Sequence, residues 1–133
     1  METDRVVIIT GAAGGVGSVL VERFLANDDT VLASDTKQEV LDVWRPGFAD
    51  AAPVDLRRRH LVRAGHRALA AVVSQRHGRV DVLINCAGYF PVVSFEEMSV
   101  ADWRTVIDVN LTGSFLTTRA VPPLMKDRGW GAS

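Results

Sequence analysis

The feature that most constrains this chain is a glycine-rich turn, GAAGGVG at residues 11–17, set between an apolar run and an amphipathic segment. The run before it, RVVIIT at 5–10, is continuously apolar and β-branched, which is typical of a strand buried on both faces of a parallel sheet. The segment after it, 18–28, predicts a helix. The order strand, glycine turn, helix is the context that a dinucleotide-binding loop requires. The expected core-facing stripe of the helix is Val16, Val19, Leu20 and Phe24, with Arg23 as a polar break.

The glycines of the turn have separate expected roles. Gly11 permits the tight turn, while Gly15 and Gly17 permit close approach of a ligand and packing of the helix on the sheet. A P-loop is excluded, because no Lys-Ser/Thr pair follows the last glycine. The turn fits T-G-x-x-x-G-x-G and, through Gly14, also T-G-x-x-G-x-x-G. The loop by itself therefore leaves its class open, and a merely structural turn is an alternative.

Three further apolar runs predict strands. They cover 30–35, 49–56 and 79–88, and Pro53 assigns the second of them to a sheet edge. Helical patterns separate these runs, and alternating strands and helices predict a parallel sheet with right-handed crossovers. The sequence therefore predicts an α/β fold, a doubly wound parallel sheet of the Rossmann type that is truncated after about four strands.

The helical patterns differ in length and detail. A short helix is expected within 36–48 and a longer one over 57–77. The longest runs from Val100 to about residue 127, has Ser99 or Asp102 as its N-cap, and must bend at Pro122-Pro123. The expected apolar face of helix 57–77 is Leu61, Val62, Gly65, Ala68, Leu69, Val72 and Val73. The repeating positions of the longest helix are Trp103, Val106, Ile107, Asn110, Leu111, Ser114, Phe115 and Thr118.

Charge and cysteine content exclude several classes of protein. The net charge is −1 with both signs interspersed, so no nucleic-acid or membrane partner is expected. Cys86 is the only cysteine, and the three histidines show no ligand spacing, so neither a disulfide nor a metal site is expected. An acidic N-terminus without a long apolar run favours a cytoplasmic protein. The cluster Arg57-Arg58-Arg59 could hold a phosphate, but the solvated start of a helix is favoured.

Asp35 stands where the second expected strand ends, about twenty residues past the glycine turn. A carboxylate there can accept hydrogen bonds from the ribose of an adenosine and would repel a 2′-phosphate. Gly14 brings no cation to offset that repulsion, and Lys37 is the nearby candidate. NAD is therefore favoured over NADP as the cofactor. The alternative is an ordinary exposed turn aspartate.

Five motifs, taken together, resemble the short-chain dehydrogenase/reductase family. They are TGAAGGVG at 10–17, Asp35, VDL at 54–56, GRVDVLINCAG at 78–88 and VIDVNLTG at 106–113. NCAG is similar to the family's Asn-Asn-Ala-Gly, with Cys86 in place of the second Asn. The resemblance favours the Gly-x-x-x-Gly-x-Gly form of the turn. It spans the whole chain but covers only the front half of the family's fold.

The resemblance implies a role for each matching position. Asn110 matches the asparagine with which the family kinks the long helix and holds a proton-relay water; without the flanking motif it would be interpreted as a helix-interior amide bonded to its own backbone. At the pyrophosphate the resemblance implies Gly11, Ala13, Gly14 and Val16, with Gly15 and Gly17 completing the turn. It implies Asp35 at the adenosine ribose, and Asp55 and Leu56 at the adenine. It implies Asn85, Ala87 and Gly88 at the ribose and nicotinamide, and Val109 at the nicotinamide.

The acid–base residues that the resemblance implies are missing. The family uses a Tyr-x-x-x-Lys pair and a serine at the far end of a fifth strand, but Tyr89 is the only tyrosine and Val93 stands four residues on. Ser133 follows Gly131 too closely to end a strand. Tyr89 is instead expected to form a wall of the cofactor or substrate cleft.

Two functions follow as expectations. In the first, residues 1–133 form an incomplete NAD(P)-binding domain, the front half of an NAD-dependent oxidoreductase that transfers hydride between nicotinamide and an alcohol or ketone, and this half is inactive alone. The alternative is a non-catalytic nucleotide-binding module that binds NAD or pairs with another subunit. In either case strand 79–88 becomes an unpaired apolar edge, which predicts self-association or a homo-oligomer.

Overall fold

The structure is a computed structural model, and it describes residues 4–36, 59–62 and 66–125. In chain order the elements are β1 (Val6–Thr10), α1 (Gly15–Ala26), β2 (Thr30–Ser34), β3 (Arg59–Val62), α3 (His66–Arg76), β4 (Val82–Asn85), α4 (Val100–Ile107), the π-helical η2 (Asp108–Thr112), α5 (Gly113–Ala120) and α6 (Pro122–Met125).

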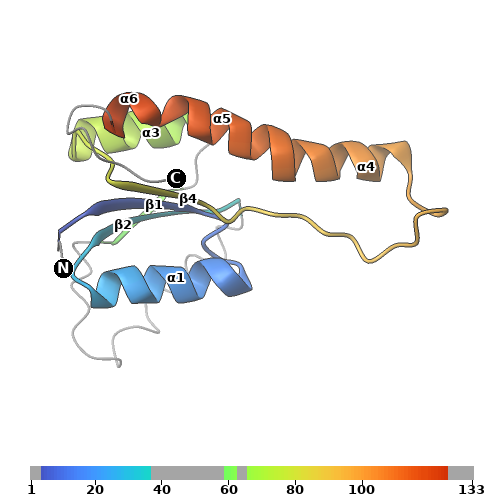
Figure 1. Ribbon diagram of the computed structural model, residues 1–133, viewed down its shortest axis with the longest axis horizontal. Coiled ribbons are helices and arrows are strands. Elements are labelled where there is room, and N and C mark those ends of the chain that lie inside the picture. The colour runs from blue at the N-terminus through green and yellow to red at the C-terminus, as the bar shows by residue number, and fades with distance from the viewer. Residues whose placement is uncertain (1–3, 37–58, 63–65, 126–133) are drawn as a thin grey trace.

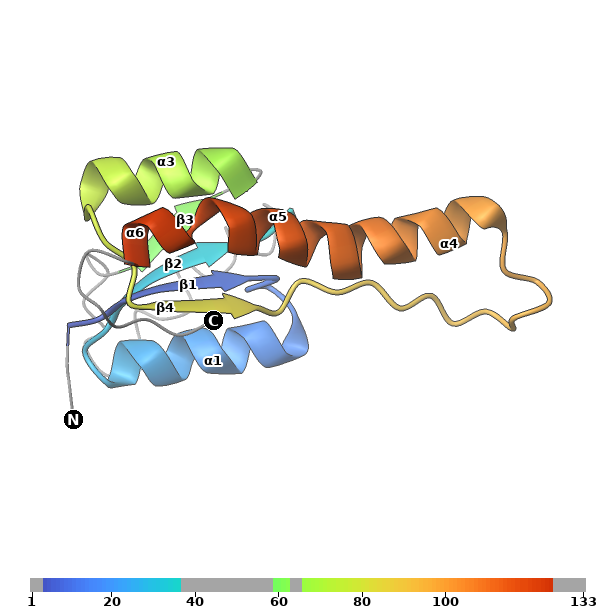
Figure 2. The same ribbon diagram turned by 45° about the horizontal axis from the view of Figure 1, so that its top comes forward.

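The described strands form one parallel sheet in the order β3-β2-β1-β4. Helix α1 covers one face, while α3, α5 and α6 cover the other (Figure 1). The segment after β4 and helix α4 extend beyond the carboxyl edge of the sheet, as the second view also shows (Figure 2). This arrangement confirms the predicted doubly wound α/β fold, and β4 lies at an edge of the described sheet, as expected.

Burial of β1 on both faces explains its unbroken apolar run. Val6 and Ile8 belong to a cluster with Leu69 and Val73 of α3, and alternate residues of the strand point the other way. The second cluster, on the side of α1, contains Val7, Ile9, Ala12, Val21, Leu25, Val31 and Ala33.

The predicted stripe of α1 was wrong in half of its apolar residues. Leu20 and Phe24 pack half-buried against the second cluster, as expected, but Val16 and Val19 are 69% and 53% exposed. The fully buried residues of the helix are Gly17, Val21 and Leu25. The buried positions are four residues apart, as a single helix face requires. The pattern was misread because Gly17, which faces the sheet, carries no apolar side chain to mark that face.

The start of the predicted helix 57–77 was also wrong. Residues Arg59–Val62 form β3, which pairs in parallel with β2, and α3 begins only at His66. The apolar pattern of such a short stretch does not distinguish a strand from a helix. Pairing with β2 decides for the strand, because it satisfies the backbone N–H and C=O groups of residues 59–62. The strand expected at 49–56 and the helix expected within 36–48 lie outside the described residues.

The long helix expected from Val100 is a chain of four helical segments. Ser99 is its N-cap: its hydroxyl accepts the Asp102 N–H, and the Asp102 carboxylate accepts the Ser99 N–H, which forms a capping box. The expected bend is confirmed, because α5 ends at Ala120 and α6 begins at Pro122. None of the described helices is long and apolar enough to cross a membrane.

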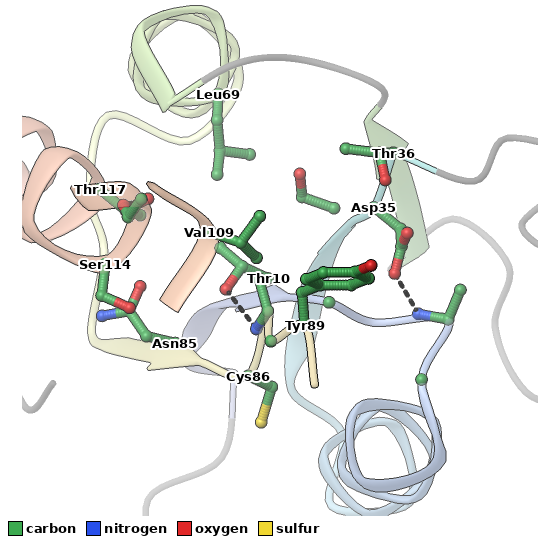
Figure 3. Close-up of a pocket in the computed structure, with 17 residues that line it drawn as sticks. Thr10, Asp35, Thr36, Leu69, Asn85, Cys86, Tyr89, Val109, Ser114 and Thr117 are labelled. Carbon is green, nitrogen blue, oxygen red and sulfur yellow. Dashed lines mark hydrogen bonds between the residues drawn. The ribbon is translucent and has the colours of Figure 1, made fainter. Parts of the chain in front are cut away.

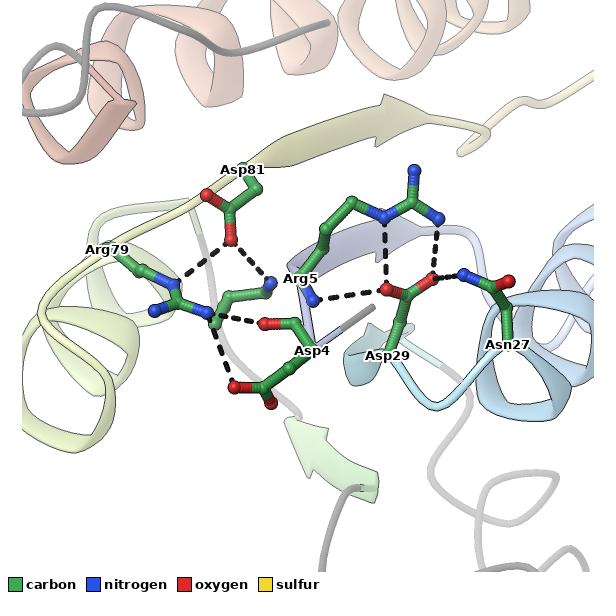
Figure 4. A network of polar contacts seen from close by, with 7 residues as sticks. Asp4, Arg5, Asn27, Asp29, Arg79 and Asp81 are labelled. Carbon is green, nitrogen blue, oxygen red and sulfur yellow. Dashed lines mark hydrogen bonds and ion pairs between the residues drawn. The ribbon is translucent and has the colours of Figure 1, made fainter. Parts of the chain in front are cut away.

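At the amino ends of the strands, two buried aspartates hold the start of β1 from either side (Figure 4). Asp29 accepts the Arg5 N–H at 3.1 Å and two bonds from the Arg5 guanidinium at 3.0 and 2.6 Å. Asp81 accepts the Val6 N–H at 2.8 Å and a bond from Arg79 Nε at 3.1 Å. Since Asp29 precedes β2 and Asp81 precedes β4, the two carboxylates fix β1 to both of its neighbours.

The Asp29 carboxyl carries a pH-dependent part of the stability. Burial raises its pKa, but hydrogen bonds from Arg5 and Asn27 and the charge of Arg5 outweigh burial and hold the pKa below its ordinary value of 3.8. In the native state the group therefore binds fewer protons than in the unfolded chain. Its stabilisation is complete above the unfolded-state pKa and is lost as the pH falls through the lowered folded-state pKa.

Replacing this carboxylate by an amide, Asp29→Asn, is expected to lower the free energy of unfolding at neutral pH by about 2 kcal/mol, because Arg5 loses its charged partner. Urea unfolding followed by circular dichroism measures the difference, which should shrink as the pH falls below the ordinary aspartate pKa. Glu22→Gln, at an exposed position on α1, is the control and should leave stability unchanged. A variant as stable as the wild type at neutral pH would contradict the expectation.

Candidate functional site

A pocket of about 450 Å³ opens where β1, β2 and β4 end (Figure 3). In a doubly wound sheet this carboxyl edge is where ligands bind, at the point where successive crossovers leave on opposite faces. Here α1 leaves β1 toward one face, and α5 returns from β4 on the other. The lining residues are Thr10, Gly11, Ala13, Gly14, Ser34, Asp35, Thr36, Leu69, Asn85, Cys86, Ala87, Gly88, Tyr89, Val109, Gly113, Ser114 and Thr117.

The glycines of the turn divide into those the fold needs and those it does not. Gly11 has φ +62°, and a Cβ there would lie 2.6 Å from the Ala87 backbone. A Cβ on Gly17 would overlap Gly11 O and lie 2.9 Å from Ala12 Cα. Gly15, by contrast, would meet no atom within 4 Å. Close packing therefore requires Gly11 and Gly17, while the bare backbone at Gly15 faces open space.

Hydrogen bonds connect the turn to both neighbouring strands. On the β2 side, Ala12 N–H donates to Ser34 O at 3.1 Å and Ala13 N–H donates to Asp35 Oδ2 at 2.9 Å. On the β4 side, Ala87 N–H donates to Thr10 Oγ1 at 3.3 Å. The turn is thus fixed in place between the ends of the strands that border the pocket.

The first turn of α1 fits a diphosphate. Its N-cap, Gly14, makes no side-chain capping bond, and the first turn holds no acidic residue. Helix N-terminal N–H groups without a cap favour an anionic ligand, and the open space beside Gly15 leaves room for close approach. A nicotinamide dinucleotide, with its diphosphate between two nucleosides, suits this cradle.

The end of β4 supplies the other wall. Asn85 Nδ2 donates to Thr118 Oγ1 at 3.1 Å, and its Oδ1 is buried without a donor among the described residues. That unmet acceptor is compatible with a ligand or further chain that carries an N–H or O–H group. Cys86 packs against the core cluster beside α1, so its thiol behaves as a small apolar group.

Asn110 holds the segment that follows β4. Its Oδ1 accepts the Tyr89 N–H and its Nδ2 donates to Tyr89 O, both at 2.9 Å. The amide therefore does not bond its own helix backbone, which rules out the plain alternative for this residue. Asn110 lies in the π-helical η2, and Ser114 Oγ donates to its main-chain oxygen at 2.9 Å. The expected irregularity of the long helix is present, and the side chain acts on Tyr89 behind the pocket lining.

The structure brings most of the predicted cofactor positions to one place. Gly15, Val16 and Gly17, in the first turn of α1, do not line the pocket; Gly15 and Val16 are exposed and Gly17 is buried. Asp55 and Leu56 lie outside the described residues. The predicted positions that line the pocket are Gly11, Ala13, Gly14, Asp35, Asn85, Ala87, Gly88 and Val109, joined by Tyr89 as expected.

Sequence reasoning missed a polar strip on the helix side of the pocket. Ser114 and Thr117 of α5 line it, together with Gly113. Ser114 was assigned only to a helical repeat. Residues three apart on a helix lie on the same side, so Ser114 and Thr117 share one side of α5. Because Val109 of the same long helix was predicted at the site, this polar pair could have been predicted there too.

Comparison with known proteins identifies related sequences and folds. The sequence model of the family described as short chain dehydrogenase matches residues 5–132. The chain is 35% identical over 127 residues to the 3-oxoacyl-[acyl-carrier-protein] reductase of Thermotoga maritima, covering 91% of this chain and 50% of that protein. It is 32% identical over 130 residues to an NADP-dependent 3-hydroxy acid dehydrogenase of Escherichia coli, covering 95% and 51%.

A solved short-chain dehydrogenase from Streptomyces avermitilis superposes with a TM-score of 0.82 at 32% identity, covering 98% of this chain and 48% of that one. The chain thus spans about half the length of the curated relatives it matches.

Two glycines of the turn, Gly15 and Gly17, make a matched pair of variants. Gly17→Ala is expected to lower the free energy of unfolding by about 2 kcal/mol, because the methyl group overlaps the Gly11 carbonyl. Gly15→Ala, at the first residue of α1, is expected to leave stability unchanged or raise it by up to about 1 kcal/mol, since alanine is the better helix former. Chemical denaturation measures both, and equal losses in the two variants would contradict the assignment.

Proposed function

Because this chain belongs to the short-chain dehydrogenase family, we propose that it binds NAD across the carboxyl edge of its sheet, as the cofactor-binding half of an oxidoreductase that transfers hydride between nicotinamide and an alcohol or ketone. The observation that carries the proposal is the pocket itself, with a glycine cradle in the middle, the Asp35 carboxylate at one end and the Asn85–Tyr89 segment at the other. NAD when bound supplies the hydride acceptor; the residues of the chain bind and orient it.

Each part of the dinucleotide has a proposed partner. The diphosphate lies on the N-terminus of α1, and Asp35 binds the adenosine ribose. The second ribose and the nicotinamide follow the end of β4 toward η2. In full, the proposed binding residues are Gly11, Ala13, Gly14, Gly15, Val16 and Gly17 at the diphosphate, Asp35 at the ribose, Asp55 and Leu56 at the adenine, and Asn85, Ala87, Gly88 and Val109 toward the nicotinamide.

The preference for NAD rests on charge. Asp35 lines the pocket directly after β2, and Gly14, across from it in the turn, brings no positive charge. A 2′-phosphate beside this carboxylate would be repelled at short range. The E. coli relative is NADP-dependent by name, so the choice of cofactor in this chain rests on its own residues.

Turnover needs a proton donor or acceptor at the substrate oxygen. Tyr89 lines the pocket, but the residue four positions on is Val93, and the amide of Asn110 is used to hold Tyr89. The chain alone is therefore proposed to bind the cofactor without turning over an alcohol or ketone, as an incomplete domain over residues 1–133. The alternative function is a non-catalytic nucleotide-binding module that binds NAD or pairs with another subunit. A cytoplasmic location stays a prediction.

Binding of NADH and NADPH separates these proposals from a merely structural turn. Wild-type chain is expected to bind NADH at least about tenfold more tightly than NADPH, which corresponds to about 1.4 kcal/mol. Fluorescence of the reduced nicotinamide measures both affinities. Equal affinities would remove the NAD preference, and no binding of either would overturn the proposed function.

In parallel, oxidation of NADH with ketone substrates is expected to be absent, and any turnover abolished by Asn110→Ala would contradict the proposal that the chain alone is inactive.

We also propose that the chain associates with itself. Trp103, Leu111 and Phe115 are 53%, 64% and 59% exposed along the line of helices α4, η2 and α5. Apolar side chains gathered on one helical segment are typical of a protein–protein contact. A second copy of the chain is the proposed partner of this surface.

Charges placed on that surface test the contact. Leu111→Glu combined with Phe115→Glu is expected to shift the chain toward monomer in sedimentation velocity, because a carboxylate opposes burial. Ser74→Glu, at an exposed position on α3, is the matched control and should leave the distribution unchanged. A wild-type chain that sediments only as a monomer would contradict self-association.

A further inference from the structure

The second half of the glycine-rich turn is held by a side chain. Ala13 donates its N–H to Asp35 Oδ2 at 2.9 Å, and the next residue, Gly14, is the N-cap of α1. The carboxylate therefore fixes the orientation of the Ala12–Ala13 peptide, just before the N-cap. The Gly14 N–H that follows donates to Gly11 O, and the N–H groups that would meet a diphosphate begin at Gly15, the first residue of α1.

Asp35 holds the chain just before α1, a helix whose N-cap makes no side-chain bond. N-caps are most often Ser, Thr, Asp or Asn, whose side chains bond the first N–H groups. Here the N-cap is Gly14, which makes no side-chain bond, and the first turn of α1 has no acidic residue. Asp35 brings a carboxylate to the residue before the N-cap from the end of β2, where the helix dipole favours negative charge.

This position gives Asp35 two opposite effects on an anion bound at the turn. Its negative charge repels the anion and weakens binding. Its bond to Ala13 orders the turn in advance, which strengthens binding by removing an ordering cost. The two effects are separable, because an asparagine keeps an oxygen acceptor for Ala13 without the charge, whereas an alanine keeps neither.

We propose that Asp35 is a positioning residue for the diphosphate-binding turn, acting through the Ala13 N–H, in addition to its proposed contact with the adenosine ribose. The inference rests on the proposed function in one respect, namely that the turn is taken to be the diphosphate site. Replacement of Asp35 then changes binding at the turn as well as at the ribose.

The experiment uses the 133-residue chain, Asp35→Asn and Asp35→Ala, with Glu22→Gln as the control at an exposed acid on α1. Amide exchange at Ala13 is measured by NMR, with exchange at Ile8 in the buried strand β1 as the internal reference for global unfolding. Inorganic pyrophosphate is titrated into each protein while the amides of residues 14–17 are followed. Pyrophosphate carries no ribose, so it reports on the turn alone.

In Asp35→Ala the Ala13 amide is expected to exchange about tenfold faster relative to Ile8, the loss of one hydrogen bond to a charged group. In Asp35→Asn the ratio should stay within about threefold of wild type, because the amide oxygen still accepts this bond. Pyrophosphate should bind Asp35→Asn at least as tightly as wild type, and Asp35→Ala about fivefold more weakly than Asp35→Asn. A charge effect alone would instead make both variants bind more tightly and equally.

Two outcomes overturn the inference: equal pyrophosphate affinities in the two Asp35 variants, or Ala13 and Ile8 exchange rising in proportion in Asp35→Ala. If pyrophosphate binds none of the proteins, the exchange ratio alone decides.

NADH titration separates this inference from the proposed function. Binding of NADH with an unchanged Ala13 ratio leaves the function standing and overturns the positioning role. No NADH binding, with a raised ratio and with pyrophosphate bound at the turn, overturns the function and supports the positioning role.

Discussion

The rest of the structure depends on the burial of β1 on both faces. Val6 and Ile8 pack toward α3, Val7 and Ile9 pack toward α1, and no side of the strand is left for water. The chain must therefore leave the carboxyl end of β1 through a narrow space between two helical layers and a neighbouring strand. Two positions there cannot carry a side chain, since a Cβ on Gly11 would meet Ala87 and one on Gly17 would meet the turn itself. At Gly15 packing excludes no side chain, and the bare backbone leaves helix N–H groups accessible to a ligand.

The two edges of the sheet use the same chemical group in different ways. Asp29 and Asp81 at the amino edge accept backbone N–H groups at the start of β1, and Asp35 at the carboxyl edge accepts one in the turn that follows β1. At the amino edge each carboxylate also meets an arginine, so its hydrogen-bonding capacity serves the fold. Asp35 lies on the wall of the pocket, where the same kind of bond fixes the proposed binding loop. Position in the sheet, rather than residue type, separates the two structural aspartates from the aspartate proposed to bind the ribose.

Local signals in the sequence predicted β1, β2, the turn and the doubly wound fold correctly, because apolar runs and glycine spacing act over a few residues. Reasoning failed where a long-range contact decides. Residues 59–62 become a strand through pairing with β2, and the buried face of α1 runs through Gly17, which has no side chain to mark it. The motif around Asn110 identified the residue, but its bonding partner could not be predicted, since Tyr89 meets it only after the helix folds back over the sheet. Ser114 and Thr117 reach the pocket by the same return.

The bonds between Asn110 and Tyr89 have a consequence for how such a protein can change. Both bonds use the main-chain N–H and C=O of residue 89, and neither uses its phenol ring. Any non-proline amino acid at this position presents the same two atoms to the amide. The Tyr89 side chain, which lines the pocket, therefore takes no part in the two bonds that hold this segment in place. Residue 89 is a place where evolution or an engineer can exchange the shape and polarity of the cavity while the scaffold around it keeps its geometry.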